Sequence, residues 1–288
     1  MNKNSSKYPI YWINLDKDIQ RRKRMSIALQ KGGWLSTRWQ ATDGNLDQEK
    51  FISYERYWQR SSVFPGSLRS SELDPLRKTL KSELACLCSW QRLTEHLQRN
   101  NLSSEWFLLM EDDVGSSLAI PHYWPYQLDD IIGQVGKGAL VVQMAPINGR
   151  TRMELHKIWL DSGKSTLVVP KANVRSHGNG AVLINKAALP LLCRRIGRWV
   201  ENFFPNVHIL GHPCNVRPVA DKWLYASLPI DKCWVATFPL FILEAKTSGI
   251  HQEHIQKFHK ASRNKTLKIW EAFGYSSLIK ADQNWFNC

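Results

Sequence analysis

Apolar and polar positions near the start of the chain follow the order strand, helix, strand. Ile10–Leu15 is a short, mostly apolar run of the kind that forms a buried strand. Residues 19–30 are expected to form a helix, which Gly32-Gly33 closes. A second strand is expected over Trp34–Ala41. A strand, a helix and a second strand in sequence favour parallel pairing, because parallel strands need a crossover between them. The pattern therefore predicts an α/β protein.

Apolar runs and helical periodicity continue to alternate in the rest of the chain. A helix is expected to begin at Asp74-Pro75, an N-cap followed by proline, and to run to about Arg99. A short helix is expected over residues 221–228. Four apolar runs predict further strands, at 106–110, 139–144, 180–184 and 233–238.

Three regions depart from this alternation. Residues 155–160 and 166–169 are expected to form the two arms of a hairpin around Asp161-Ser162-Gly163. Residues 45–73 lack periodicity, and we interpret them as an irregular insert or lid. From Ser248 onward the chain is polar and basic, and no element is predicted there.

The composition is that of an ordinary globular protein, with 43% hydrophobic and 22% charged residues in a chain of 288. No apolar run approaches the roughly 18 residues that a membrane span needs. The segment Met1–Lys7 is polar and has no apolar signal core, so we expect a cytoplasmic protein. The six cysteines include no CxxC pair, which argues against a structural zinc site or a disulfide framework and favours reduced thiols.

The formal net charge of +14 indicates an anionic partner. Such a charge attracts nucleic acid, anionic lipid or phosphate-bearing substrates. The 13 tryptophans can stack on sugars or bases, or pack in the core. Nucleic-acid binding is the less favoured alternative, because no reader motif is present and the basic residues alternate with acids. The charge also predicts a loose peripheral contact with anionic lipid at the inner face of the membrane.

The most informative stretch is Trp106–Val114, in which five apolar residues run directly into Glu111, Asp112 and Asp113. Ligands of open α/β sheets bind beyond the carboxyl ends of the strands. In strand geometry Glu111 and Asp113 point one way and Asp112 the other. Glu111 and Asp113 are therefore candidate ligands for Mn²⁺ or Mg²⁺, with a diphosphate completing the shell. The alternative is three solvated acids in a turn.

Six short segments occur in one order between residues 9 and about 250: Ile13-Asn14-Leu15-Asp16, Ala41-Thr42-Asp43-Gly44, Ser82–Trp90, Leu109–Val114, Gly178–Ile184 and Pro218-Val219-Ala220-Asp221. The ordered set resembles glycosyltransferase family 25, which includes bacterial lipopolysaccharide and lipooligosaccharide glycosyltransferases and the collagen galactosyltransferases. The resemblance implies a GT-A-like fold, with a Rossmann-type mixed, mostly parallel sheet flanked by helices. It also implies a divalent metal and a nucleotide-sugar donor, with a UDP-sugar favoured.

The resemblance further implies a catalytic domain over residues 1–250, followed by a basic tail over 251–288 that can pack on it. The chain departs from the family pattern at several positions. Trp90 stands in place of a histidine and Val182 in place of a tyrosine, while Ser82 and Ala85 replace glycines. Either the donor or acceptor has changed in this chain, or the chain is a catalytically weakened relative.

Five residues are candidates for binding the donor. Asn14 and Asp16 follow the first strand at the expected nucleotide edge, although Asp16 can instead cap the helix. Arg21 can face the phosphates or lie on a solvated helix face. Asp43 can contact the base or ribose, or only form its turn. Asp112 can hydrogen-bond the sugar or ribose, or only support the end of its strand.

Asp221 is the candidate general base, because it occupies the position of the family's P-V-D aspartate, and the alternative is an N-cap for the following helix. The sequence thus favours a metal-dependent glycosyltransferase that moves a hexose, galactose-type favoured, to a cell-envelope glycan such as lipopolysaccharide, free or lipid-linked. The alternative of another class is a non-catalytic relative that binds glycans.

Overall fold

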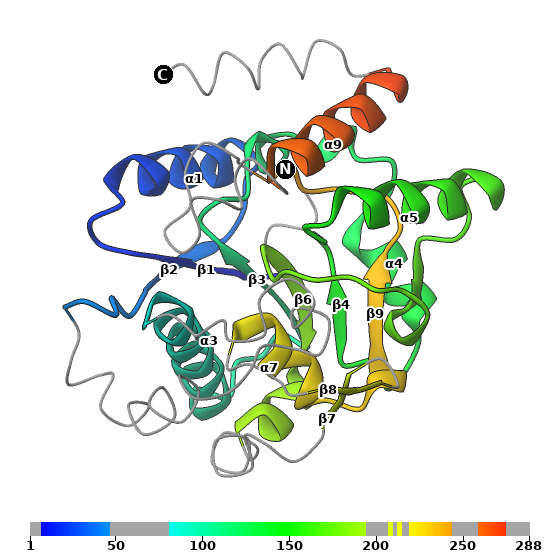
Figure 1. Ribbon diagram of the computed structural model, residues 1–288. Coiled ribbons are helices and arrows are strands. Elements are labelled where there is room, and N and C mark those ends of the chain that lie inside the picture. Colours follow the sequence, from blue (N-terminus) through cyan, green and yellow to red (C-terminus); the bar gives the residue numbers. More distant parts are fainter. Residues whose placement is uncertain are drawn as a thin grey trace.

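The computed structural model of the chain describes residues 7–46, 81–193, 207–209, 212–214, 219–243 and 259–274 (Figure 1). The helices of this part are α1 (Ile19–Lys31), α3 (Lys81–Arg99), α4 (Leu128–Val135), α5 (Gly149–Asp161), α7 (Ala220–Ala226) and α9 (Lys260–Ala272). The strands are β1 (Ile10–Asn14), β2 (Ser36–Gln40), β3 (Trp106–Glu111), β4 (Val141–Gln143), β5 (Val168–Pro170), β6 (Ala181–Asn185), β7 (Val207–Ile209), β8 (His212–Cys214) and β9 (Cys233–Ala236). None of the helices among these residues is long and apolar enough to cross a membrane.

Seven of these strands form one mixed sheet in the order β2-β1-β3-β6-β4-β9-β5, and β7 and β8 form a separate pair. β1 pairs in parallel with both β2 and β3, and β4 pairs in parallel with β9. β6 and β5 run against their neighbours. Five strands of this sheet therefore share one direction, and the prediction of an α/β fold with a mixed, mostly parallel sheet is confirmed.

Helices cover both faces of the sheet (Figure 1). On one face, α1, α4, α5 and α9 contribute side chains such as Leu29, Ile131 and Trp159 to a core cluster that includes Leu108 and Met110 of β3. On the other face, α3 and α7 pack against the alternate residues of β3, Phe107 and Leu109. The alternation of strand side chains between the two faces separates these two cores.

The first part of the chain follows its predicted pattern closely. The order β1, α1, β2 is the predicted unit, and Gly33 at the end of α1 has a φ of 70°, where glycine is favoured. The predicted strands at 106–110, 139–144, 180–184 and 233–238 are present as β3, β4, β6 and β9. The predicted start of α3 at Asp74-Pro75, and nearly all of the predicted lid at 45–73, lie outside the described residues.

The predicted hairpin at 155–160 and 166–169 is wrong. Residues Gly149–Asp161 form α5, and the Asn148 side chain caps it by accepting hydrogen bonds from the Arg150 and Thr151 amides at 2.8 and 3.4 Å. The buried residues of α5 have helical spacing, but three of them are polar, Thr151, Arg152 and His156. The apolar Met153, Ile158 and Leu160 are instead exposed, so the polarity pattern gave a misleading period.

The predicted basic tail contains α9, which packs against α5. Ile269 and Trp270 of α9 are buried in the same cluster as Trp159 of α5 and Phe238. The Trp270 indole donates a hydrogen bond to the Pro239 carbonyl at 2.8 Å. Residues 260–272 are thus part of the folded core, and the division of the chain at residue 250 stays a prediction.

Candidate functional site

A cavity of about 470 Å³ lies at the carboxyl ends of β1 and β3, where ligands of α/β sheets bind. Its walls come from the segment after β1, the start of α1, the turn after β2, the first half of α3, the end of β3, the loop before β6 and the start of α7. The predicted site residues that line it are Asn14, Arg21, Asp43, Glu111, Asp112, Asp113 and Asp221. The fold therefore brings together residues that are more than 200 positions apart in the sequence.

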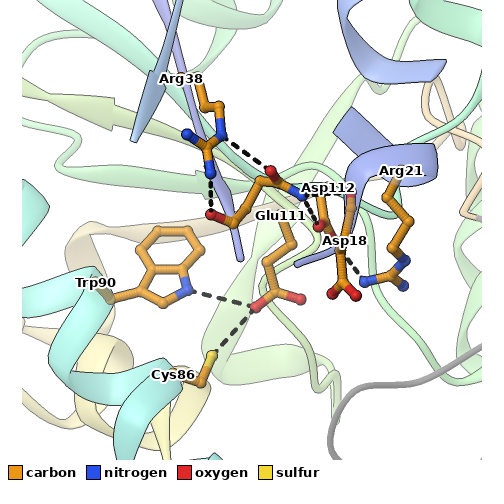
Figure 2. A network of polar contacts seen from close by, with 8 residues as sticks. Asp18, Arg21, Arg38, Cys86, Trp90, Glu111 and Asp112 are labelled. Atoms are coloured by element: carbon orange, nitrogen blue, oxygen red, sulfur yellow. Dashed lines mark hydrogen bonds and ion pairs between the residues drawn. The ribbon is translucent and has the colours of Figure 1, made fainter. Parts of the chain in front are cut away.

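Asp112 is buried and held from two sides, as Figure 2 shows. It accepts a hydrogen bond from the Asn14 amide at 2.6 Å and forms an ion pair with Arg21 at 2.5 Å. Arg38 fixes Asn14 in turn, because its Nε donates to the Asn14 side-chain oxygen at 2.9 Å. Burial raises the pKa of Asp112 to about 6, although Arg21 and the Asn14 amide act against that rise. Arg21 and Asp112 thus neutralise each other at the cavity wall.

Asp16 is absent from the lining residues of the cavity. Its exposed carboxylate is bound by Arg38 and by the Gln40 amide, the latter at 2.5 Å, and Arg38 hydrogen bonds hold its pKa below the usual value. Asp16 is connected to the cavity only indirectly among the described residues, because Arg38 donates both to Asp16 and to the cavity-lining Asn14.

Asp43 lines the cavity from the turn after β2. One of its oxygens accepts the Asn45 amide at 3.0 Å, which closes an Asx turn, and the other pairs with Lys17 at 2.7 Å. Burial alone would raise the pKa of Asp43, but Lys17 and the Asn45 amide outweigh it and hold the pKa below its usual value. The turn-forming role of Asp43 is therefore present in the structure, whatever it contacts in a ligand.

Glu111 points to the opposite side of the sheet from Asp112, as strand geometry predicts (Figure 2). Its Oε1 accepts a hydrogen bond from the Trp90 indole at 3.3 Å and lies 3.8 Å from the Cys86 thiol, both on α3. Burial and the neighbouring Asp113 raise the pKa of Glu111 to about 8. Among the described residues, no lysine or arginine forms an ion pair with Glu111.

Asp113 is also without an ion pair within the part of the chain that the structure describes, and its Oδ1 is buried with no hydrogen-bond partner there. A buried carboxylate oxygen without a partner is costly unless something cationic binds it. Among these residues no three His, Cys, Asp or Glu side chains are arranged as a metal site. Two carboxylates, with the other coordination positions left to a ligand, nevertheless fit Mg²⁺ or Mn²⁺. Mg²⁺ is commonly bound through one or two carboxylates plus substrate phosphates.

Asp221 lies in the first turn of α7, on the other side of the cavity from Arg21. The alternative role as an N-cap is wrong, because the N-cap residue of α7 is Val219 and Asp221 is already inside the helix. Its Oδ2 accepts a hydrogen bond from the Gly178 amide at 3.2 Å, and its Oδ1 accepts the Lys222 amide at 2.9 Å. Asp221 therefore joins α7 to the loop before β6.

Several residues around the site were not singled out as site residues from the sequence. Trp90 was noted only as a departure from a family pattern, and it is a fully buried partner of Glu111. Asn179 lines the cavity with both amide atoms buried and unpartnered among the described residues. Val182, the other noted departure, is fully buried in the core between α3 and the sheet and does not line the cavity. The acidic triplet and two partners of Asp112, Asn14 and Arg21, could be singled out from the sequence, whereas nothing there indicated that Trp90 binds Glu111 or that Asn179 lines the cavity.

Comparison with solved structures gives a distant structural likeness. No family model matches the chain, and no curated protein matches it. Among solved structures, the chain is similar to the crystal structure of mouse xyloside xylosyltransferase 1 in its apo form, with 10% sequence identity and a TM-score of 0.37. The similarity covers 76% of this chain and 80% of that one. Such a distant likeness carries no information on donor, acceptor or catalytic residues.

Proposed function

We propose that the chain is a metal-dependent glycosyltransferase that binds a nucleotide sugar in the cavity at the ends of β1 and β3. One observation carries the proposal. Glu111 and Asp113 lie in a cavity with no cationic side chain paired to either among the described residues, and one oxygen of Asp113 is buried without a partner. A divalent cation carrying a diphosphate supplies the missing positive charge.

The two carboxylates would be the protein's ligands to such a cation. Glu111 and Asp113 would hold it, and the bound ion would stabilise the negative charge of the departing diphosphate as a Lewis acid. Trp90 orients Glu111 by donating to its Oε1, which fixes one carboxylate oxygen toward α3. Because burial and Asp113 raise the pKa of Glu111 to about 8, a cation held there would compete with a proton at neutral pH.

The opposite wall suits the nucleotide. Asn14 and Asp112 stand at the strand ends, and Lys17 and Asp43 stand at the rim. Asp112 and Asp43 offer carboxylate oxygens that can accept hydrogen bonds from ribose or sugar hydroxyls. Arg21 reaches Asp112 and is therefore a support of this wall rather than a free phosphate ligand.

Asp221 is the group we propose as the general base for an acceptor hydroxyl. It lies in the same cavity as the two proposed metal ligands, and a backbone amide of Gly178 orients one of its oxygens. A general base must lie within hydrogen-bond reach of the proton that it removes. The proposal therefore requires the acceptor hydroxyl to lie in this cavity, next to Asp221.

The finer assignment rests on the sequence resemblance. The six segments are the reason for proposing a glycosyltransferase related to family 25. The proposed reaction is then transfer of a hexose, galactose-type favoured, from a UDP-sugar to a cell-envelope glycan such as lipopolysaccharide. Three of those segments supply Asp43, Glu111 with Asp113, and Asp221 to the one cavity, which supports reading them as a set. A lipid-linked acceptor would agree with the net charge of +14 and a loose contact with anionic lipid.

A glycan-binding protein without transferase activity is the second candidate. It is favoured by Trp90, which stands where the resembled family has a histidine and which contacts Glu111 directly. Hydrolysis of a panel of nucleotide sugars, with Mn²⁺ and with EDTA, separates the two. A transferase is expected to hydrolyse its own donor slowly and only with Mn²⁺. Binding of a donor, seen as a raised melting temperature, without any turnover would favour the second candidate.

A further inference from the structure

A buried lysine lies directly behind the proposed base. Lys171, in the short 3₁₀ turn after β5, is only 2% exposed. Its Nζ donates to the Gln143 side-chain oxygen at 2.9 Å, to the Ser176 hydroxyl at 2.9 Å and to the Ser176 carbonyl at 3.0 Å. An ammonium group has three donors, so these three bonds satisfy it completely.

Two further bonds connect this ammonium to Asp221. The Gln143 amide that accepts from Lys171 also donates from its Nε2 to the Gly178 carbonyl at 2.6 Å. The Gly178 amide then donates to Asp221 Oδ2 at 3.2 Å. Lys171 also lies over the Tyr225 ring, 3.8 Å from its centre, and Tyr225 is one turn after Asp221 on α7. Lys171 therefore holds both the loop and the helix that present Asp221.

Gly178, which links Gln143 to Asp221, cannot be replaced by a residue with a side chain without moving the loop. Its φ is +95°, and a Cβ there would lie 2.3 Å from the Ile147 side chain. Any side chain would push the loop away from Ile147 and move the amide that orients Asp221. The geometry of the loop is thus fixed by Ile147 on one side and by Gln143 on the other.

The positive charge of Lys171 needs its own explanation. Its hydrogen bonds go to neutral groups, and an uncharged buried network would hold the same loop without the cost of burying an ion. Burial lowers the pKa of Lys171 to about 8, and Asp221 acts against that fall. Tyr225, Cys233 and His177 also face Lys171; burial raises the pKa of Tyr225 and Cys233 and lowers that of His177, so each favours its neutral form. Asp221 is therefore the anion that a charged Lys171 can stabilise.

We propose that Lys171 is a positioning residue that holds Asp221 oriented toward the cavity. This inference rests on the proposed role of Asp221 as the general base. Asp221 is also faced by His177, by Lys222 on its own helix, and by Cys86 and Tyr225. Lys171 is distinguished from these groups by being a buried cation that is linked to Asp221 through defined hydrogen bonds.

The test is a double-mutant cycle on the full chain, with Lys171→Met and Asp221→Asn alone and combined. Lys171→Met is expected to lower kcat about tenfold, with little change in KM for the donor. In the Asp221→Asn background, Lys171→Met should have almost no further effect on kcat.

Lys186→Met is the matched control. Lys186 also donates its Nζ to a carbonyl, that of Leu102 at 2.6 Å, but it lies at the other end of β6 and outside the cavity. Its substitution is expected to leave kcat unchanged. If Lys171→Met does not fold, Gln143→Glu replaces it, because this variant keeps the side-chain shape and places a neutralising charge against Lys171. The same loss of kcat is expected.

The outcomes separate the two proposals. Near wild-type turnover of Asp221→Asn overturns the base role and this inference with it. If Asp221→Asn loses turnover but Lys171→Met and Gln143→Glu keep the wild-type rate, only the role of Lys171 is overturned. Losses that multiply in the double variant also overturn it, because they show a structural effect independent of Asp221.

Discussion

The acids predicted as site residues fall into two groups that differ in their partners. Asp16, Asp43 and Asp112, on the β1–α1–β2 side, each have an arginine or lysine within ion-pair distance. Glu111, Asp113 and Asp221 have none among the described residues. A carboxylate paired inside the protein contributes to the wall of a site. A carboxylate left unpaired in a cavity is available to bind a cation or to accept a proton from a ligand. In the proposed site, the paired acids therefore support the walls and the unpaired acids act on the ligand.

The largest effect is expected for Asp113→Asn. Transfer and donor hydrolysis should be abolished, because the variant removes a proposed metal ligand, while the melting temperature should stay within a degree or two of wild type because no ion pair is lost. EDTA should reproduce the loss in the wild type, and Mn²⁺ should restore only the wild type. Full activity of the wild type in EDTA would contradict the metal assignment.

The adjacent Asp112→Ala should behave in the opposite way. Removing one partner of a buried ion pair typically costs about 3–5 kcal/mol of stability, and Arg21 and the Asn14 amide would both lose their partner. Urea unfolding measures this loss, with Asp113→Asn as the control. If the two variants lose equal stability, the division into paired and unpaired acids has no energetic meaning.

The buried cation gives a dependence of stability on pH. The pKa of Lys171 is about 8 in the folded protein, against an ordinary value of 10.5. Between these values the unfolded chain binds more protons at this residue than the folded chain, so its contribution to stability rises with pH, by up to about 3 kcal/mol. The free energy of unfolding of wild type, relative to Lys171→Met, should therefore increase from about pH 7 to about pH 10 in urea titrations. A constant difference would mean that Lys171 titrates normally.

The smallest effect is expected for Asp16→Asn. The carboxylate is exposed and paired with Arg38 in solvent, and such pairs contribute about 0–1 kcal/mol. We expect little change in melting temperature and less than a tenfold change in KM for the donor. A loss as large as that of Asp113→Asn would place Asp16 in direct contact with the donor.

Much of the fold followed from local pattern, and the exceptions have physical causes. β1, α1 and β3 were predictable because their buried positions, apart from Asn14 at the end of β1, are apolar and their periods differ. α5 was not, because it buries Arg152 and His156 and exposes Met153, Ile158 and Leu160. Arg152 is stabilised by contacts far along the chain, including Thr266 Oγ1 at 2.6 Å, which no local pattern contains.

The site was predictable to a similar extent. Acids that follow a buried strand must lie at the sheet edge where ligands bind, so Glu111, Asp112 and Asp113 could be placed from the sequence. The sequence could not show which of these three acids is paired. Arg21 and Asn14 reach Asp112 only because β1 pairs in parallel with β3. Lys171 resembles a surface lysine in the sequence, and only the fold brings it behind Asp221.

The most direct test of the account is calorimetric titration of UDP into the full chain, with Mn²⁺ and with EDTA, for wild type and Asp113→Asn. The unpaired acids are proposed to hold the cation that carries the diphosphate. We therefore expect wild type to bind UDP with Mn²⁺, to bind it at least tenfold more weakly in EDTA, and Asp113→Asn to lose the advantage that Mn²⁺ gives. Equal binding of UDP by wild type with Mn²⁺ and with EDTA, or no binding in either, would contradict the central claim.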